Sequence, residues 1–542
     1  MKHNIFIYKN KNTILNSIKL SFKKFNFYKI EYKYYNTPDK IPIIMPSNSE
    51  FGNLLDIKEE GGYIYYLNKK HKELGPLFYF YIYDRLCLSL GHPKYWQYIS
   101  NLSAKTHLIR LFMKNLFGSL NTVALQNSEE RNRRYEKYII PFVNIKTVEE
   151  KHSKIFIRNI INFNKRLKKY SSNNIKMPLI EELSICVLKN VLELLLAVYD
   201  ITDSECVKIY NYLTFCILNI ELQSFDNNVD KILKEEIDYK INYIHTFIKR
   251  NVDKRLEYLK DNKSINNKSN SNKYDFEVDL FTDYDSSSLY NKKYCLVDYL
   301  SQEYNKEVIY TDVTAFFFAS IHNNISTLFS TIYNLSKHND KQILLFQEIE
   351  NSLKDNSITP QSIRQLRYLR MCINESMRII PPVNTSSRTN NESDIIISNF
   401  IIPKDTTFIT PFTLASYNED VWKNYKDFIP ERFKDSLNYK LQHSPFGFAG
   451  GRICPGKNIT WIMNQLILTN IFKNFSLFIC DNKIELNEVD TIKKSRNLIN
   501  YKYWKIKEHK NLFINDSNLN LFYGSGTVVL DEVFLKIKER SN

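Results

Sequence analysis

One cysteine of this 542-residue chain lies where a reactive thiolate would be stabilised. Cys454 follows the glycine-rich stretch FGFAGG and precedes Gly456. An apolar pattern at helical spacing starts directly after Gly456, which predicts a helix that begins just beyond the cysteine. The free N–H groups and the dipole of a helix N-terminus favour a thiolate. A thiolate held there could bind a metal; the alternative is a buried structural cysteine in a glycine-rich loop.

The residues around Cys454 suit a flat, anionic ligand. Glycines such as Gly450 and Gly456 let the backbone turn tightly and approach a ligand closely. Backbone N–H groups could then hydrogen-bond the sulfur and tune a bound metal. Arg452 could pair with a carboxylate of the ligand.

A second group of charged residues lies upstream of this loop. Glu375 and Arg378 are three positions apart, on the same side of a predicted helix that stops at Pro381-Pro382. Such a pair is usually exposed and contributes little on its own. Arg432, in the segment DFIPERFKD, would reach the pair. A buried cluster of three charges fixes geometry more than it adds stability.

The order of these motifs resembles the cytochrome P450 family. ExxR at Glu375 comes first, PERF at 430–433 follows, and the glycine-rich loop with RxCxG around Cys454 comes last. The segments IPKDTTF at 402–408 and ELGPLFYF at 73–80 resemble two further stretches of that family. The ordered set is specific, although each motif alone is not.

The resemblance implies a haem b cofactor (iron protoporphyrin IX) whose iron takes its axial thiolate ligand from Cys454. Arg388 and Arg452 would reach the haem propionates. The cofactor-binding residues are then Cys454, Arg452, Arg388, Phe446, Gly450 and Gly456, and the structural core consists of Glu375, Arg378 and Arg432.

Thiolate ligation favours O–O cleavage once oxygen is bound. The resemblance therefore implies a monooxygenase, an oxidoreductase that inserts one oxygen atom of O2 into a hydrophobic substrate of the sterol, fatty acid or xenobiotic class. The second oxygen atom leaves as water. The sequence does not identify the substrate further.

The helix expected on the oxygen side departs from the family pattern. Along 319–324, His322 replaces the family's acid, and Asn323 or Asn324 replaces its threonine. Histidine can carry protons near neutral pH, so His322 and Asn323 are the candidate catalytic residues. Two alternatives stay open: a thiolate-haem isomerase or dehydratase without external electrons, and a catalytically decayed haem-binding protein.

Two further departures concern the haem contacts. Gly447, flanked by Phe446 and Phe448, stands where the family has an aromatic residue. In the family's WxxxR motif, Asn132 replaces the tryptophan and Glu136 the arginine. The substitutes we expect for that arginine are Arg133, Arg134 and Lys137.

Helical periodicity dominates the chain, which predicts a mainly α fold with small β-sheets. We expect a single large, cytochrome P450-like domain over 46–510, with strands at 77–90 and within 392–412. The segment 261–292, rich in Asn, Ser, Lys and Asp, is predicted to be a low-complexity insertion. A basic segment, 1–45, precedes the domain, and an extension, 511–542, follows it.

Composition narrows the possible classes. Hydrophobic residues make up 43%, enough for a large core, and the formal net charge is +16. Lysine is spread along the whole chain, so we predict no nucleic-acid binding. The eight cysteines form no CxxC pair, which argues against a disulfide framework or a zinc site. No apolar run reaches about 18 residues, the length of a membrane-spanning helix.

Electrons are expected from a separate donor, because no GxGxxG or other sign of a flavin or nicotinamide domain occurs. The donor would be a ferredoxin-type protein or an NADPH-P450 reductase, drawn to a positive face with Arg367, Arg370 and Lys457. The first 35 residues hold eight lysines and one acid, typical of a mitochondrial presequence or a membrane-surface helix. We predict a membrane-associated intracellular enzyme. The mitochondrial inner membrane is favoured and the endoplasmic reticulum is the alternative, although Asn374 replaces a lysine usual in mitochondrial members.

Overall fold

The computed structural model describes most of the chain between residues 41 and 540. The described ranges are 41–46, 51–102, 116–118, 120–123, 125, 129–225, 231–266, 295–353, 357–435, 441–448, 452–480, 516, 519, 521–523, 527–530 and 532–540. Most of the predicted N-terminal basic segment and most of the predicted insertion lie outside these ranges.

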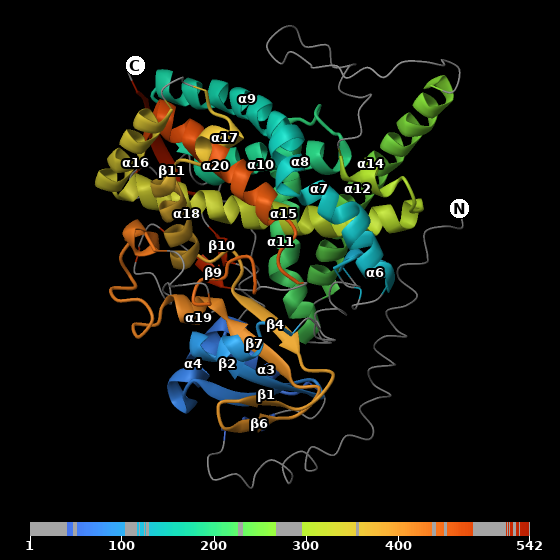
Figure 1. Ribbon diagram of the computed structural model, residues 1–542, viewed down its shortest axis with the longest axis vertical. Coiled ribbons are helices and arrows are strands. Elements are labelled where there is room, and N and C mark those ends of the chain that lie inside the picture. The colour runs from blue at the N-terminus through green and yellow to red at the C-terminus, as the bar shows by residue number, and fades with distance from the viewer. Residues whose placement is uncertain are drawn as a thin grey trace.

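The long helix α15 (Lys306–Lys337) runs through the middle of the helical region (Figure 1). Asn305 caps its first turn by accepting a hydrogen bond from the N–H of Val308 at 3.1 Å. The helix is buried along most of its length, because α10 (Leu179–Leu196), α12 (Lys231–Asn266) and α18 (Arg367–Ile379) pack around it. The oxygen-side segment 319–324 therefore lies on a rigid central element.

The other helices surround this centre. In chain order they are α3 (Leu54–Glu59), α4 (Tyr63–Leu74), α6 (Glu129–Arg134), α7 (Ile140–Val143), α8 (Ile145–Thr147), α9 (Ser153–Ser172), α11 (Asp203–Phe225), α14 (Leu296–Leu300), α16 (Asn339–Ser352), α17 (Pro360–Ile363), α19 (Phe412–Ser416) and α20 (Lys457–Asn474), with a 3₁₀ turn, η5, at Pro430–Phe433 and π-helical turns at Tyr135–Ile139 and Val148–His152.

The predicted strands at 77–90 are confirmed. β1 (Leu77–Ile82) and β2 (Arg85–Leu90) form a hairpin whose turn has Tyr83 at a φ of 53°. β2 pairs in parallel with β7 (Thr407–Pro411), and β7 pairs antiparallel with β4 (Thr385–Thr389), so the sheet order is β1-β2-β7-β4. This sheet lies with α3 and α4 at one end of the molecule (Figure 1).

Three smaller sheets complete the fold. β5 (Ile395–Ile397) pairs with β6 (Phe400–Ile402), which confirms the short strands expected within 392–412. β11 (Phe534–Glu539) lies between β3 (Met177–Pro178) and β8 (Phe475–Ile479). The sheets position loops around the ends of the helices.

The C-terminal segment is integral to this architecture. β11 belongs to the β3-β11-β8 sheet, and β9 (Leu521–Tyr523) with β10 (Thr527–Val529) forms a hairpin that contacts α15 (Figure 1). All three strands lie in the predicted extension 511–542, so its described strands pack with the rest of the fold. Helix α12 likewise continues to Asn266, so the first residues of the predicted insertion 261–292 are helical.

The structure confirms a mainly α fold with small sheets. Within the described residues, none of the helices combines the length and the apolarity needed to cross a bilayer.

Candidate functional site

Cys454 lies at the start of α20, as the glycine pattern predicts. Its N–H donates to the carbonyl of Phe446 at 2.9 Å, which closes the loop on itself, and Gly456 is the residue before the helix. Among the described cysteines, only Cys454 and Cys480 are partly exposed. Burial raises the pKa of the thiol at sites such as Cys186, to about 12, so that those cysteines stay protonated. Cys454 is therefore both accessible to a ligand and close to the N-terminus of a helix.

Gly447 adopts a conformation that favours glycine. Its φ is +83°, and its N–H donates to the carbonyl of Ser444 at 2.9 Å. A Cβ there would lie about 4 Å from Arg388, with Nη2 at 4.0 Å. Glycine at this position, in place of the family's aromatic residue, thus permits a left-handed backbone conformation. A side chain there would lie next to the buried guanidinium of Arg388.

The two aromatic neighbours of Gly447 anchor the loop on different sides. The ring of Phe446 lies 5.9 Å from that of Trp461 on α20. Phe448 is buried and packs edge-on against Trp96 and Phe412, at 5.7 and 5.8 Å. Gly450, also predicted to contact the cofactor, lies outside the described residues.

Gly456 has no steric reason to be glycine in this structure. Its φ is −75°, and an added Cβ would reach only ordinary contact with the sulfur of Cys454, at 3.8 Å. The glycine would be required only if a flat ligand filled the space beside that sulfur.

Arg388 on β4 is a buried cation without an acidic partner among the described residues. It donates from Nη1 to the Ser387 carbonyl at 2.8 Å and to the Ser386 hydroxyl at 3.2 Å, whereas its Nε is buried without a partner. Burial lowers the pKa of Arg388. An unpaired buried charge is costly, and a carboxylate ligand would compensate for it. This orphaned nitrogen is the observation that best fits a haem propionate.

Arg452 and Arg131 bring further positive charge to the same region. Arg452 donates to the carbonyl of Leu125 at 3.1 Å. The pKa of Tyr135 is raised, first by burial, and it also responds to the charges of Cys454 and Arg452, so the phenol lies near both. The guanidinium of Arg131 lies 4.8 Å from the Tyr135 ring and is only 7% exposed. Arg388 of β4 thus lies close to the cysteine loop that carries Arg452, and Arg131 of α6 packs on the neighbouring Tyr135.

The residues expected to replace the family's arginine as haem contacts form ion pairs with other parts of the protein. Arg133 and Lys137 form ion pairs with Glu303. Arg134 is buried against Asp312 of α15 at 3.0 Å. Arg131 and Arg134 are the buried residues of α6, and sequence reasoning missed Arg131. Its spacing of four from Tyr135 was the only available signal.

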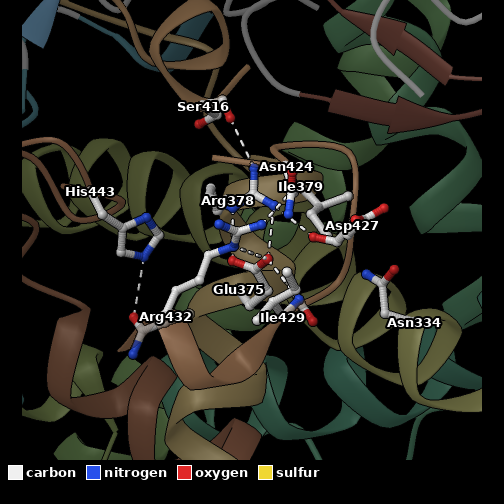
Figure 2. A network of polar contacts seen from close by, with 12 residues as sticks. Asn334, Glu375, Arg378, Ile379, Ser416, Asn424, Asp427, Ile429, Arg432 and His443 are labelled. Carbon is white, nitrogen blue, oxygen red and sulfur yellow. Dashed lines mark hydrogen bonds and ion pairs between the residues drawn. The ribbon is translucent and has the colours of Figure 1, made fainter. Parts of the chain in front are cut away.

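Glu375, Arg378 and Arg432 meet in a buried cluster (Figure 2). Arg378 holds both oxygens of Glu375, at 2.7 and 2.8 Å, and Arg432 reaches the same carboxylate at 3.2 Å. Arg378 also donates to the carbonyl of Ser416 at 2.9 Å. The N–H of Ile429 donates to Glu375 at 3.0 Å. The carboxylate is therefore satisfied by four N–H groups, and it ties α18 to the PERF turn η5.

The oxygen-side residues make contacts that sequence spacing could not reveal. His322 is buried, and its Nε2 lies 3.2 Å from the carbonyl of Thr527 in β10. Burial lowers the pKa of His322 to about 4, so the ring is neutral near pH 7. Asn323 is half-buried and donates to the carbonyl of Ala319 at 2.9 Å. The contact to β10 makes His322 an anchor between α15 and the C-terminal hairpin, and its low pKa removes the argument that it titrates near neutrality.

Comparison with known proteins agrees with this geometry. A family model described as Cytochrome P450 matches residues 42–500 of the chain, which therefore belongs to the cytochrome P450 family. Members of this family hold haem through a cysteine thiolate and incorporate oxygen from O2 into their substrates.

Individual relatives match over shorter stretches. Cytochrome P450 4e2 of Drosophila melanogaster is 32% identical over 177 residues, 32% of this chain and 33% of the relative. The mitochondrial 1,25-dihydroxyvitamin D(3) 24-hydroxylase of Rattus norvegicus is 29% identical over 209 residues, 38% of this chain and 40% of the relative. Cytochrome P450 3A28 of Bos taurus is 33% identical over 172 residues, 31% of this chain and 33% of the relative. The matched segments thus span about two fifths or less of these relatives.

The Glu375 cluster generates a stability prediction. Arg378→Lys removes the two-pronged contact and leaves the carboxylate undersatisfied, so we expect a loss of about 3 kcal/mol or more in the free energy of unfolding. Denaturant unfolding followed by circular dichroism measures this loss. The matched control is Arg364→Lys, which alters an exposed pair with Glu149 and should change stability by less than about 1 kcal/mol. Equal effects of the two variants would contradict the assignment.

His322 generates a pH prediction. Its folded pKa of about 4 lies below the ordinary 6.5, so the unfolded chain binds the proton first as the pH falls. Its contribution to stability is full above pH 6.5 and declines toward pH 4, by up to about 3 kcal/mol. His322→Gln should flatten the fall in melting temperature across this window. His338→Gln, at the end of the same helix, is the control, and unchanged slopes in both variants would refute the prediction.

Proposed function

We propose that this protein is a haem-thiolate monooxygenase in which Cys454 supplies the axial ligand to haem b. The observation that carries the proposal is the partly exposed Cys454 at a helix N-terminus beside the buried, incompletely paired Arg388. One feature suits a metal and the other suits an acidic edge of the ligand. Arg452 and Arg131 would hold the remaining negative charge.

Each part of the chain has a separate task in this proposal. The bound haem supplies the oxygen chemistry, which sulfur donation favours. The Glu375 cluster holds the PERF turn and α18 in place behind the thiolate loop. Ala319 and Asn323 of helix α15 would line the opposite side, where the carboxamide oxygen of Asn323 would hold a water. Proton delivery would then run through ordered water, because His322 is neutral and bonded to β10.

The proposed net reaction inserts one atom of O2 into a C–H bond of a hydrophobic small molecule. Two electrons and two protons convert the other atom to water. The electrons come from a separate ferredoxin-type protein or NADPH-P450 reductase. Arg367 and Lys457 are exposed at the starts of α18 and α20. Arg370, one turn beyond Arg367 on α18, donates to the carbonyl of Arg364 at 3.0 Å. These cations support a docking face for an acidic donor.

A membrane-surface location in the cell fits the same proposal. Ile232 is 72% exposed at the start of α12, next to the exposed Lys231. An apolar side chain beside a cation suits the interface of an anionic bilayer. We favour the mitochondrial inner membrane over the endoplasmic reticulum. The basic N-terminal segment supports this choice, and three of the relatives carry "mitochondrial" in their names.

A thiolate-haem isomerase or dehydratase is the second candidate. It is favoured by the oxygen-side residues, since neither the neutral His322 nor Asn323 is a ready proton relay. Such an enzyme would rearrange an already oxygenated substrate and would need no electron donor. A haem-binding protein that has lost catalysis is a third possibility on the same observation.

Removal of the sulfur tests the proposal directly. In Cys454→Ala the strongly red-shifted main absorbance band of the reduced, carbon monoxide-treated protein should disappear, because a thiolate ligand causes that shift. Cys480→Ala is the matched control, since it alters the other partly exposed cysteine. A purified, folded protein without haem, or an unchanged band in Cys454→Ala, would overturn the proposal.

Oxygen consumption separates the monooxygenase from the alternatives. With either type of donor and NADPH, we expect oxygen uptake that depends on the donor and on a hydrophobic substrate. An isomerase or dehydratase would convert its substrate without donor or oxygen. If the protein converts no apolar substrate even with peroxide as oxidant, it fits the third possibility, a haem-binding protein that has lost catalysis.

A further inference from the structure

The carboxylate of Asp312 on α15 accepts hydrogen bonds from parts of the chain that are far apart in sequence. The N–H of Thr122 donates to Oδ1 at 2.5 Å, and the Thr122 hydroxyl donates to Oδ2 at 2.9 Å. Arg134 of α6 donates to Oδ2 at 3.0 Å and also to the carbonyl of Leu120 at 2.6 Å. Asp312 is fully buried, so these bonds form away from water, where they are strong. The carboxylate therefore fixes both Thr122 and α6 on the central helix.

The segment that contains Thr122 lies along α15 at two further points. Its described residues, which we call the connecting segment, are 116–118, 120–123 and 125. Gly118, at a φ of +92°, approaches α15 so closely that an added Cβ would lie 2.5 Å from the side chain of Thr311. The ring of Phe117 lies 5.2 Å from that of Phe318 on the same helix. The connecting segment is therefore fitted to α15 over about two helical turns.

The end of the connecting segment contacts the cysteine loop. The carbonyl of Leu125 accepts a hydrogen bond from Nη2 of Arg452 at 3.1 Å. The N–H of Leu125 donates to the carbonyl of Asn121 at 3.2 Å, which closes a turn directly beside the threonine that Asp312 holds. A continuous set of contacts thus runs from Asp312 through the connecting segment to Arg452, the arginine expected to meet an acidic edge of the cofactor.

We propose that Asp312 is a positioning residue: it holds the connecting segment so that the carbonyl of Leu125 sets the side chain of Arg452 toward a carboxylate of the cofactor. This inference rests on the proposed haem-thiolate function. A guanidinium has several N–H donors, so the bond to Leu125 leaves others for the cofactor. Arginine loses much rotamer freedom when it binds a ligand, and a carbonyl that fixes one nitrogen beforehand removes part of that cost.

The test weakens the contact at Asp312 and leaves its charge pair intact. Thr122→Val replaces the donating hydroxyl by a methyl group of similar size, and Thr122→Ser restores the hydroxyl. Asp312→Asn is the second variant and removes the charge. Thr331→Val is the matched control, because the buried Thr331 hydroxyl donates within α15, to the carbonyl of Thr327 at 2.8 Å. Each change is made in the wild-type chain and in Arg452→Gln, and the haem-loaded proteins are mixed with excess apomyoglobin to measure the rate of haem release.

We expect Thr122→Val to release haem about ten-fold faster than the wild-type protein, the value of one net hydrogen bond. Asp312→Asn should accelerate release at least as much, whereas Thr122→Ser and Thr331→Val should release haem at nearly the wild-type rate. In Arg452→Gln the Thr122→Val change should add nothing further, because its effect passes through that arginine.

Two results would overturn the role of Asp312. One is a rate of haem release that neither Thr122→Val nor Asp312→Asn changes. The other is an equal acceleration by Thr122→Val with and without the Arg452→Gln change, since Asp312 would then only secure the fold. Melting temperatures measured beside the rates report that structural contribution, which should be the same in both backgrounds.

Failure of this inference can be told apart from failure of the proposed function. The carbon monoxide spectrum of the wild-type protein reports the bond between Cys454 and iron. A normal spectrum combined with additive effects of the Thr122 and Arg452 changes refutes the role of Asp312 alone. A wild-type protein that holds no haem, or that lacks the red-shifted band, refutes the haem-thiolate proposal and this inference with it.

Discussion

The carboxylate of Glu375, held inside the protein by two guanidinium groups, is the constraint on which the thiolate loop depends. A buried carboxylate tolerates only a geometry that satisfies it, and here Arg378 and Arg432 fix α18 against the PERF turn. The preceding residue on α18, Asn374, lies 3.2 Å from the ring nitrogen of His443. His443 precedes Ser444, whose carbonyl accepts from Gly447 at the entrance of the cysteine loop. A continuous set of polar contacts thus links the buried cluster to the turn that presents Cys454.

Features that depend on spacing within one element could be predicted from the sequence. The ExxR pair lies on one helix face because three residues make most of a turn, and a glycine-rich stretch before an apolar helical pattern places Cys454 at a helix start. The mainly α fold and the β1–β2 hairpin are consequences of the same periodicities. The order of the motifs indicated the resemblance to the cytochrome P450 family, which no single motif would have indicated.

Contacts between distant segments could not be predicted in this way. His322 bonds a carbonyl 205 positions away, in a hairpin within the predicted extension 511–542. Spacing did not show that Arg131 and Arg134 are the buried residues of α6, because the phase of a short helix depends on its packing partners. Nor can spacing show that the Nε of Arg388 is left unpaired. These features depend on tertiary packing, which overrides local patterns.

The two sides of the site differ in how completely their buried polar groups are hydrogen-bonded within the protein. Behind the thiolate, the Glu375 carboxylate accepts hydrogen bonds from four N–H groups, so that side would keep its shape before any cofactor arrives. In front of it, Arg388 and His322 each retain a buried nitrogen without a partner. Such groups destabilise the protein alone and stabilise it when a ligand supplies the missing atoms, which couples ligand binding to folding. For Arg388 the missing atom is an anionic oxygen, and for His322 it is a hydrogen-bond donor. The unpaired guanidinium nitrogen therefore describes the ligand on this side, a cofactor with an acidic edge.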